Sequence, residues 1–409
     1  MLRSIVVAAV SAVVAAFAVV PAVQAQNIKI GIIGPMGFIQ GEYHWDGAEM
    51  ARDEINKAGG IRVGNSRRMI EIVKADSNEM TSVPDATNAM ERVITRDKVD
   101  FVVGGFRSEA VLAMQEVAMD NKKIFIGTGS TLSKLGQNVA ADYNRYKYWF
   151  RLSPTKDTDL VRSVFAILGS VGEQIRRDLK KDTPKVAILA EKAAWTEAMV
   201  GASQKVLPGM KMEVVGVWQP SAVATDVTAE LSAIERSGAD VVYTLLSGPV
   251  GVVVGRQMGE RNMKAVAFGI NVEAQKDEFW AATAGKGQYV ATVDTYSDVE
   301  MTPKTLAFMK AFRDRYKKAP TYTAQTYDAL YILKDAIEKA GSVDADKVVP
   351  AIEQMEHVGT GSTVTWDKQH DPIWAVGKTA GIGVQWQNGK KVPFWPPQIK
   401  GMQSFAMPK

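Results

Sequence analysis

The 409-residue chain carries 49 Lys and Arg against 45 Asp and Glu, for a formal net charge of +4, and it contains no cysteine. The absence of cysteine excludes disulfides, thiol catalysis and thiolate metal sites. The near balance of charge, without a long basic block, argues against a nucleic-acid partner, because such proteins usually carry a clustered basic face.

The first segment of the chain predicts export. A short basic start precedes an almost wholly apolar run from Ile5 to Val20, and small residues stand at Val23 and Ala25. This pattern is typical of a secretory signal peptide, residues 1–25, cleaved after Ala25. A membrane anchor is the alternative, but the apolar run is shorter than the about 20 residues that a span requires. We therefore expect the rest of the chain to be free in its compartment, with no cysteine to carry a lipid.

The next part of the chain predicts a first series of alternating strands and helices. The strands are short apolar runs, and the helices have one apolar face with glycine or proline near an end. Strands are predicted at 29–33, 69–75, 101–103 and 124–126, and helices at 46–57, 84–95 and from Ser108 onward. A tyrosine-rich stretch then leads to residues 150–154, where we expect the first crossing between two lobes.

A second series of the same kind follows. Its strands are predicted at 186–189, 213–217, 241–245 and 265–268, and its helices near 158–169, 196–206, 226–237 and 251–261. A strand at 289–293 is expected to return to the first lobe, where amphipathic helices at 303–316, 324–340 and 344–354 would pack. The tail from Gly359 predicts short strands that cross back. The expected lobes are therefore 26–152 plus 293–356, and 153–292 plus 357–409.

Two stretches of the chain repeat one pattern. Asp100 precedes a strand, a helical run and a second strand that ends at Gly127, and Asp240 precedes the same arrangement, which ends at Gly269. Each copy has the order of a parallel α/β unit. We therefore predict an α/β protein with two similar doubly wound parallel-sheet lobes joined by a multi-strand hinge. Facing lobes place their strand-end loops around one cleft, which is where open α/β sheets bind ligands.

Signals for catalysis are weak, so we predict no catalytic residue, no metal site and no cofactor. His44, His357 and His370 have no companion at metal-ligand spacing, and we expect each to be a surface or loop residue. The loop from Gly127 begins like a dinucleotide-binding loop, but Leu132 stands where the third glycine belongs. Neither a P-loop nor a Gly-x-Ser-x-Gly elbow is present.

Two loops of the first lobe offer polar recognition instead. The loop 104–109 places Ser108 at a helix start, where it could be a plain N-cap or could help present N–H groups to a carboxylate. The loop 127–131 combines small residues such as Gly129 with hydroxyls, so that a ligand could approach the backbone. An ordinary turn is the alternative. The two loops are adjacent in such a sheet, which favours a binding role.

These features together resemble the substrate-binding proteins of ABC importers with the type I periplasmic fold, in the leucine/isoleucine/valine-binding branch. The resemblance covers most of the chain after residue 25, and its motifs occur in order at 28–36, 46–48, 55–61, 104–108, 127–131 and 325–329. It implies a periplasmic protein that is not an enzyme, with a small-molecule ligand and an inner-membrane ABC permease as its partners. We expect the chain to act as a monomer.

The resemblance also implies roles for particular residues. In that family, hydroxyl and backbone groups of the two loops hold the ligand's α-carboxylate, and Ser108, Ser130 and Thr131 match those positions. An aromatic residue of the second lobe covers the ligand, and Trp195 stands at that place, with a core tryptophan as the alternative. A tyrosine after the long first-lobe helix contributes as well, and Tyr322 matches it.

The sequence departs from the family where an acid pairs with the ligand's ammonium. Asn271 occupies that position, and Glu273 follows two residues later. A buried ammonium without a carboxylate is costly, so either Glu273 turns into the site or the ligand has no ammonium. Arg107 could clamp a carboxylate or simply face solvent. The expected ligand is a branched-chain or related amino acid, with an aromatic carboxylate or an amide as the alternative.

Two rival roles stay open on this fold. A periplasmic sensor would hand ligand status to a receptor, although the sequence shows no evident output domain and fits transport better. A secreted enzyme would need a nucleophile or a metal set that the sequence does not offer.

Overall fold

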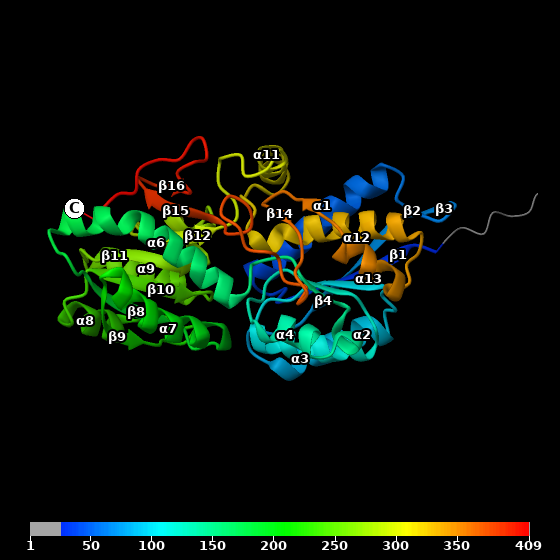
Figure 1. Ribbon diagram of the computed structural model, residues 1–409, viewed down its shortest axis with the longest axis horizontal. Coiled ribbons are helices and arrows are strands. Elements are labelled where there is room, and N and C mark those ends of the chain that lie inside the picture. The colour runs from blue at the N-terminus through cyan, green and yellow to red at the C-terminus, as the bar shows by residue number, and fades with distance from the viewer. Residues whose placement is uncertain (1–25, 409) are drawn as a thin grey trace, which may run out of the picture.

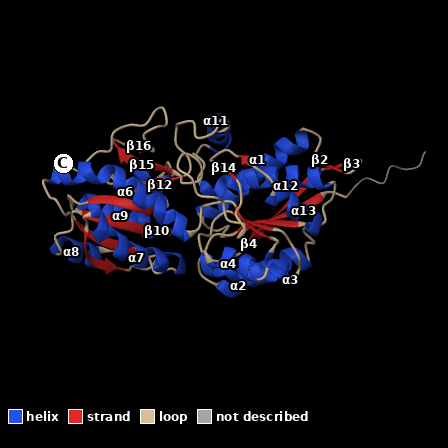
Figure 2. Cartoon of the chain, viewed as in Figure 1, coloured by secondary structure: helices blue, strands red, loops and turns tan. Residues whose placement is uncertain are grey.

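The computed structural model describes residues 26–408, which form two α/β lobes side by side (Figure 1). Each lobe has a central sheet with helices on both of its faces (Figure 2). The expected signal peptide, residues 1–25, lies outside the described residues. Within the described residues, no helix is long and apolar enough to cross a membrane.

The sheet of the first lobe has five parallel strands. Its inner strands are apolar on both faces, as strands covered by helices on both sides must be. The strand order is β4 (Ile70–Asp76), β1 (Ile28–Gly34), β5 (Phe101–Gly104), β6 (Phe125–Gly127) and β7 (Trp149–Arg151).

The sheet of the second lobe repeats this order and extends it. Five parallel strands are followed at one edge by two antiparallel ones, which the sequence had predicted only as short strands of the tail. The order is β9 (Glu213–Trp218), β8 (Lys185–Ala190), β10 (Val241–Leu246), β11 (Val266–Asn271), β12 (Ala291–Asp294), β15 (Ile382–Gln387) and β16 (Lys390–Trp395). Two short hairpins stand apart, β2 (Ile61–Val63) with β3 (Ser66–Arg68) and β13 (His357–Val358) with β14 (Thr363–Val364).

The two aspartates of the sequence repeat make the same contact in both lobes. The Asp100 carboxylate accepts a hydrogen bond from the backbone N–H of Lys29 at 2.9 Å, and Asp240 accepts one from Lys185 at 2.9 Å. Each aspartate thus joins the start of its own strand to the start of the first strand of its sheet. The prediction of two similar doubly wound lobes is confirmed.

The helices are divided between the lobes. Those that pack on the first lobe are α1 (Ile39–Lys57), α2 (Val83–Thr95), α3 (Ser108–Asp120), α4 (Lys134–Ala141), α5 (Tyr143–Tyr146), α11 (Thr305–Tyr316), α12 (Thr326–Ala340) and α13 (Ala345–Glu353). Those of the second lobe are α6 (Asp157–Leu179), α7 (Ala194–Val206), α8 (Thr228–Arg236), α9 (Val250–Glu260) and α10 (Phe279–Ala282). Short 3₁₀ turns lie at η1 (Leu207–Met210), η2 (Glu273–Gln275) and η3 (Tyr322–Gln325).

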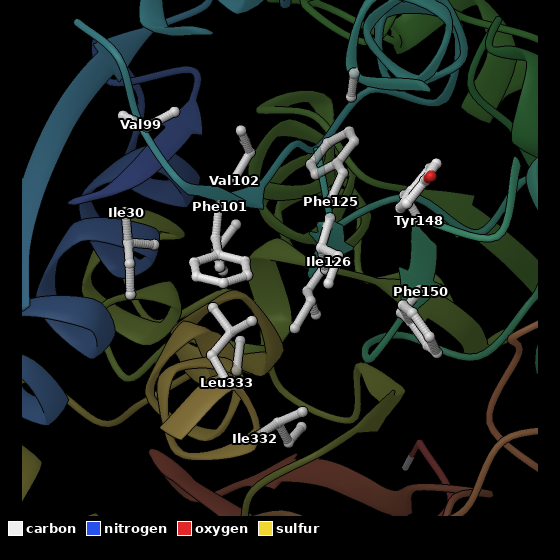
Figure 3. Packing of buried hydrophobic residues seen from close by; sticks show 14 of the residues in the cluster. Ile30, Val99, Phe101, Val102, Phe125, Ile126, Tyr148, Phe150, Ile332 and Leu333 are labelled. Atoms are coloured by element: carbon white, nitrogen blue, oxygen red, sulfur yellow. The ribbon is translucent and has the colours of Figure 1, made fainter. Parts of the chain in front are cut away.

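The core of the first lobe joins segments that are far apart in the sequence. Figure 3 shows Phe101 and Ile126 of the sheet on the same side as Ile332 and Leu333 of α12, while Phe125 points to the other face. All five side chains are fully buried. Helix α12 therefore completes a core whose strands were formed much earlier in the chain.

One strand, β12, belongs to the second lobe, whereas the sequence predicted that it returns to the first. Residues 291–294 form β12, which pairs with β11 and β15 of the second sheet and does not return to the first lobe. All four residues of β12 are buried there. The return follows Asp294, and α11 to α13 then pack on the first lobe, while β15 and β16 rejoin the second. The exact lobe boundaries stay a prediction.

The expectation that the three histidines are surface or loop residues is wrong for two of them, since His44 lies in α1 and His357 in β13; His370 does lie in a loop, but it too is buried. His44, His357 and His370 are at most 4% exposed. The His370 ring stacks on Phe150 at 4.1 Å and shares a hydrogen bond with the Glu353 carboxylate at 2.9 Å. His44 lies inside α1, where burial lowers its pKa to about 4. The burial of His370 is accompanied by ring stacking and by hydrogen-bond partners at both ring nitrogens, which spacing rules for metal ligands do not address.

Candidate functional site

A cavity lies between the lobes, where the strand-end loops of both sheets meet. It encloses about 970 Å³ of space, part of it open to solvent, and both lobes contribute to its wall. Much of the wall is apolar, with Phe106, Leu152, Leu160, Ile270, Val272 and Val293 among its side chains. The polar part of the wall includes Ser108, Thr131, Glu191, Gln275 and Asp294.

The predicted hydroxyl loops meet at one end of this cavity. Ser108 is the first residue of α3, and the cap position before it is Arg107, so the hydroxyl of Ser108 does not serve as the helix cap. It instead accepts a hydrogen bond from the Ser130 hydroxyl at 3.1 Å. Thr131 is 7% exposed, and its hydroxyl has no hydrogen-bond partner in the described part of the chain. An unpartnered buried hydroxyl beside a helix N-terminus is suited to an anionic oxygen.

Gly129 allows these two loops to approach each other. A Cβ atom at this position would lie 2.2 Å from the carbonyl oxygen of Gly105. The glycine is therefore required by the packing of loop on loop, whereas the sequence suggested that it gives a ligand access to the backbone. Ser108, Gly129 and Thr131 all line the cavity, whereas Ser130 does not line it and contributes its hydrogen bond to Ser108.

A buried acid, Glu79, holds the first loop from behind. One oxygen of its carboxylate accepts hydrogen bonds from the backbone N–H groups of Phe106 and Arg107, at 3.0 and 2.8 Å. The other oxygen accepts from the Ser77 hydroxyl at 2.8 Å. Burial raises the pKa of Glu79 to about 7. The loop that carries Ser108 is thus fixed by a group that titrates near neutral pH.

A buried base, Arg151, holds the second loop in the same way. Its guanidinium donates to the carbonyl oxygens of Ser130 and Leu132, the latter at 2.8 Å, on either side of Thr131. It also pairs with the Asp371 carboxylate at 2.6 Å, and both side chains are fully buried. This end of β7 had been predicted only as a crossing segment. The arginine fixes the backbone that positions the Thr131 hydroxyl.

The second lobe contributes Trp195, which lines the cavity from the first turn of α7 and is 7% exposed. Its indole N–H donates to the Glu191 carboxylate at 3.1 Å. Glu191 also accepts from the backbone N–H groups of Ser247 and Gly248, at 2.8 and 2.9 Å, and from the Ser247 hydroxyl. The tryptophan ring is therefore held in one orientation against the cavity.

Tyr322, which the resemblance implies for the site, lines the cavity from the first lobe. Its backbone carbonyl accepts a hydrogen bond from the Ser153 hydroxyl at 3.0 Å. Burial, and then the nearby Glu191 carboxylate, raise the pKa of its phenol. Tyr322 and Glu191 thus line the same cavity from opposite lobes.

The structure does not bring Asn271 and Glu273 into the cavity, since neither is among the described residues that line it. The Asn271 amide donates to the Gly251 carbonyl at 3.1 Å, and its side-chain oxygen accepts from the N–H of Ala274 at 3.4 Å. Glu273 pairs with Lys276 at 2.6 Å. Both side chains are engaged by groups of the protein, which explains why positional matching alone did not place them correctly.

Arg107 lines the cavity but is turned toward an acid of its own loop. It pairs with Glu109 at 3.3 Å, and the same carboxylate accepts a hydrogen bond from the backbone N–H of Ala194 at 2.9 Å. Ala194 belongs to the second lobe, at the start of α7. A second contact between lobes joins Gln40 to Glu273 at 3.3 Å. The lobes are therefore in direct contact at the rim of the cavity.

Comparisons with known proteins identify the family. The family model described as periplasmic binding protein matches residues 27–377. The chain belongs to the periplasmic binding protein family. An amino acid binding protein of Pseudomonas aeruginosa is 28% identical over 350 residues, covering 84% of this chain and 87% of the relative. A Leu/Ile/Val-binding protein of Rhizobium johnstonii is 27% identical over 372 residues, covering 88% and 92% of the two chains.

Solved structures of solute-binding proteins share the fold of this periplasmic binding protein. An ABC transporter solute-binding protein of R. palustris, in complex with benzoate, has a TM-score of 0.75 at 21% identity, covering 90% of this chain and 95% of the other. The branched-chain amino acid binding protein LivJ of Streptococcus pneumoniae, in complex with isoleucine, has a TM-score of 0.73 at 22% identity, covering 89% and 97%. The predicted resemblance and fold class are confirmed.

Several residues that build the site of this periplasmic binding protein carry no local motif. Glu79, Arg151, Glu191 and Gln275 lie at or shortly after the ends of strands β4, β7, β8 and β11. A charged or amide residue just beyond a buried strand is the only signal that could have found them. Within residues 26–408, no group of three His, Asp or Glu side chains could hold a metal ion.

Proposed function

We propose that this periplasmic binding protein is the solute-binding component of an ABC importer, which captures a small carboxylate-bearing ligand between its lobes and delivers it to a permease. Branched-chain and related amino acids are the first candidate class, and aromatic carboxylates are the second. The proposal includes export by the signal peptide at 1–25 and action in the periplasm. The family membership supports binding without turnover.

One observation carries the carboxylate assignment. The first turn of a helix has N–H groups without partners inside the helix, and α3 presents these groups beside the Ser108 and Ser130 hydroxyls. The Thr131 hydroxyl, which has no hydrogen-bond partner within residues 26–408, completes the set. Such a group of donors at a helix N-terminus stabilises negative charge.

The rest of the cavity supports capture of an apolar body. Trp195 and Tyr322 approach it from opposite lobes, so a ligand would be enclosed only when the lobes come together. The contact of Glu109 with Ala194 and that of Gln40 with Glu273 would then hold the enclosed form. A ligand favours this form only by its greater affinity for it.

Replacement of Thr131 by valine tests the carboxylate assignment. The purified protein is unfolded and refolded to remove bound solute, and its dissociation constants for leucine, phenylalanine and 3-phenylpropanoate are measured by titration calorimetry. A hydrogen bond to a charged group contributes about 1.5 to 3 kcal/mol, so Thr131→Val should weaken binding of the responding compound at least about tenfold.

Thr128 offers a matched control for this experiment. Its hydroxyl is also buried and has no partner among the described residues, but Thr128 does not line the cavity. Thr128→Val should therefore leave the dissociation constant unchanged. Equal affinities of Thr131→Val and the unaltered protein would place the carboxylate elsewhere.

A further inference from the structure

We propose that the ligand is a carboxylate that has no ammonium group and whose far end donates a neutral hydrogen bond, as a hydroxyl does, to Gln275. This inference rests on the proposed function and narrows its ligand class. It follows from the hydrogen bonds and ion pairs that each acid at the cavity already makes. It also follows from one residue on the wall of the second lobe whose side-chain oxygen has no hydrogen-bond donor among the described residues.

An ammonium group enclosed between the lobes would need a carboxylate with free acceptor capacity, because an unpaired buried charge is costly. Three acids line the cavity among the described residues, namely Glu109, Glu191 and Asp294. The question is therefore whether any of them can still accept hydrogen bonds from inside the cavity.

Glu191 has no acceptor capacity left. A carboxylate offers about four lone-pair positions. Trp195 and the hydroxyl of Ser247 occupy those of one oxygen, and the N–H groups of Ser247 and Gly248 occupy those of the other. Its charge is already stabilised by four donors, and an ammonium could bind only by displacing one of them.

Asp294 already has a cation of its own. Its carboxylate pairs with the buried Lys391 ammonium at 2.7 Å and accepts from the N–H groups of Thr295 and Tyr296, at 2.7 and 3.3 Å. A second ammonium beside Lys391 would be repelled. Asp294 therefore behaves as the partner of Lys391 and not as a ligand group.

Glu109 stands at the rim. Its side chain is 32% exposed, and one oxygen accepts from both Arg107 and Ala194. The Arg107 guanidinium balances this charge, so the rim carries no excess negative charge that would attract a cation. Because Glu109 adjoins the carboxylate site, it is also the acid whose replacement tests the inference most directly.

Gln275 supplies the second half of the inference. It lines the cavity, is 5% exposed, and its side-chain N–H donates to the carbonyl oxygen of Val293 at 2.8 Å. That bond fixes the orientation of the amide, which leaves the side-chain oxygen without a hydrogen-bond partner in the described chain. A buried amide oxygen that lacks a donor is costly. A ligand hydroxyl would satisfy it without introducing charge.

The two residues whose side-chain oxygens lack partners within the described residues line opposite walls of the cavity, Thr131 in the first lobe and Gln275 in the second. Apolar side chains such as Phe106, Trp195 and Ile270 contribute the wall around them. A ligand with a carboxylate at one end, an apolar or aromatic body and a hydroxyl at the other would match this wall.

Four related compounds test both features together. Phenylalanine, tyrosine, 3-phenylpropanoate and 3-(4-hydroxyphenyl)propanoate differ only in whether they carry the ammonium and the hydroxyl, and leucine with 4-methylpentanoate adds an aliphatic pair. Dissociation constants are measured by calorimetry on the refolded full-length protein. We expect each ammonium-free compound to bind at least tenfold more tightly than its amino acid, and 3-(4-hydroxyphenyl)propanoate to bind most tightly.

Two variants test separately the preference for a hydroxyl and the preference against an ammonium group. Gln275→Met should reduce the advantage of the hydroxylated compound over 3-phenylpropanoate by about tenfold, while its loss of the Val293 contact affects both compounds alike. Glu109→Gln should leave the preference against ammonium unchanged. Tighter binding of leucine, phenylalanine or tyrosine than of the ammonium-free partner would overturn the inference and leave the proposed function standing. If none of the six compounds bound, both would fail.

Discussion

The buried pair of Arg151 and Asp371 gives a prediction that separates stability from ligand binding. Arg151→Met removes the nearer of two cations from a fully buried carboxylate. Breaking a buried pair costs about 3 to 5 kcal/mol, and we expect the lower end here because Lys156 still lies 3.5 Å from the other oxygen of Asp371. The substitution also leaves the carbonyl oxygens of Ser130 and Leu132 without this donor, at about 1 kcal/mol or more each. We expect the free energy of unfolding to fall by about 5 kcal/mol, a large share of the about 5 to 15 kcal/mol of a typical protein.

Replacing both members of the pair distinguishes the two effects. In the double variant Arg151→Met with Asp371→Leu no unpaired charge is left, so we expect at least about 2 kcal/mol of the stability to return. Ligand affinity should not return, because the loop around Thr131 still lacks its donor. Urea unfolding, followed by tryptophan fluorescence, measures the stability, and calorimetry with the responding carboxylate measures the affinity.

An exposed pair serves as the control. Lys310 and Asp314, whose side chains are 77% and 66% exposed, pair at 2.6 Å, and Lys310→Met should change the free energy of unfolding by less than about 1 kcal/mol. Full recovery of affinity in the double variant would refute the view that Arg151 positions the loop. If the stability loss of the double variant equalled the sum of the losses of Arg151→Met and Asp371→Leu alone, the coupling of the pair would be refuted.

Three further predictions concern titration and contact between the lobes. The folded protein holds the Glu79 proton up to about pH 7, against an ordinary pKa of 4.5, so the stability from this group is present below pH 4.5 and is lost, by about 3 kcal/mol, as pH rises to 7. Glu79→Gln should remove that loss when the free energy of unfolding is measured with urea at several pH values between 5 and 8. An equal pH dependence of the free energy of unfolding in the variant and in the unaltered protein would contradict this prediction. His44 changes stability with pH in the opposite direction, because its pKa in the folded protein, about 4, lies below the ordinary value of 6.5. Its stability is present above pH 6.5 and is lost as pH falls to 4, and His44→Gln should flatten that limb of the unfolding curve. Glu109→Gln weakens the contact with the N-terminus of α7 at Ala194, and we expect ligand affinity to fall severalfold, by about 1 kcal/mol; an unchanged constant in calorimetry would show that this contact does not support the enclosed form.

The fold was predictable where the signal was local. Strands β5 and β10 are short apolar runs introduced by Asp100 and Asp240, and both the elements and the repeat were found from the sequence alone. Strand β7 was not, because it ends in Arg151, a charge that normally marks a loop. The partner that allows its burial, Asp371, lies more than two hundred positions away in the chain, and no pattern within a window of the sequence contains that information.

The site was predictable only in part, for the same reason. Ser108, Thr131 and Trp195 stand in loops or at helix starts, and the structure brings all three to one cavity. Asn271 was matched by position, yet its direction depends on the Gly251 carbonyl, to which its amide donates. Gln275 was not recognised, because its role depends on which of its two amide atoms is occupied, and that is decided by a neighbouring strand.

The pairing of β12 with β15 has a consequence for the order in which the chain can fold. Between these two strands the chain builds α11 to α13 on the other lobe, so the second sheet gains its final strands only after those helices have been synthesised. A chain that stopped before Ile382 would leave the edge of β12 unpaired, and open strand edges pair readily with other chains. Truncated products of this protein should therefore aggregate.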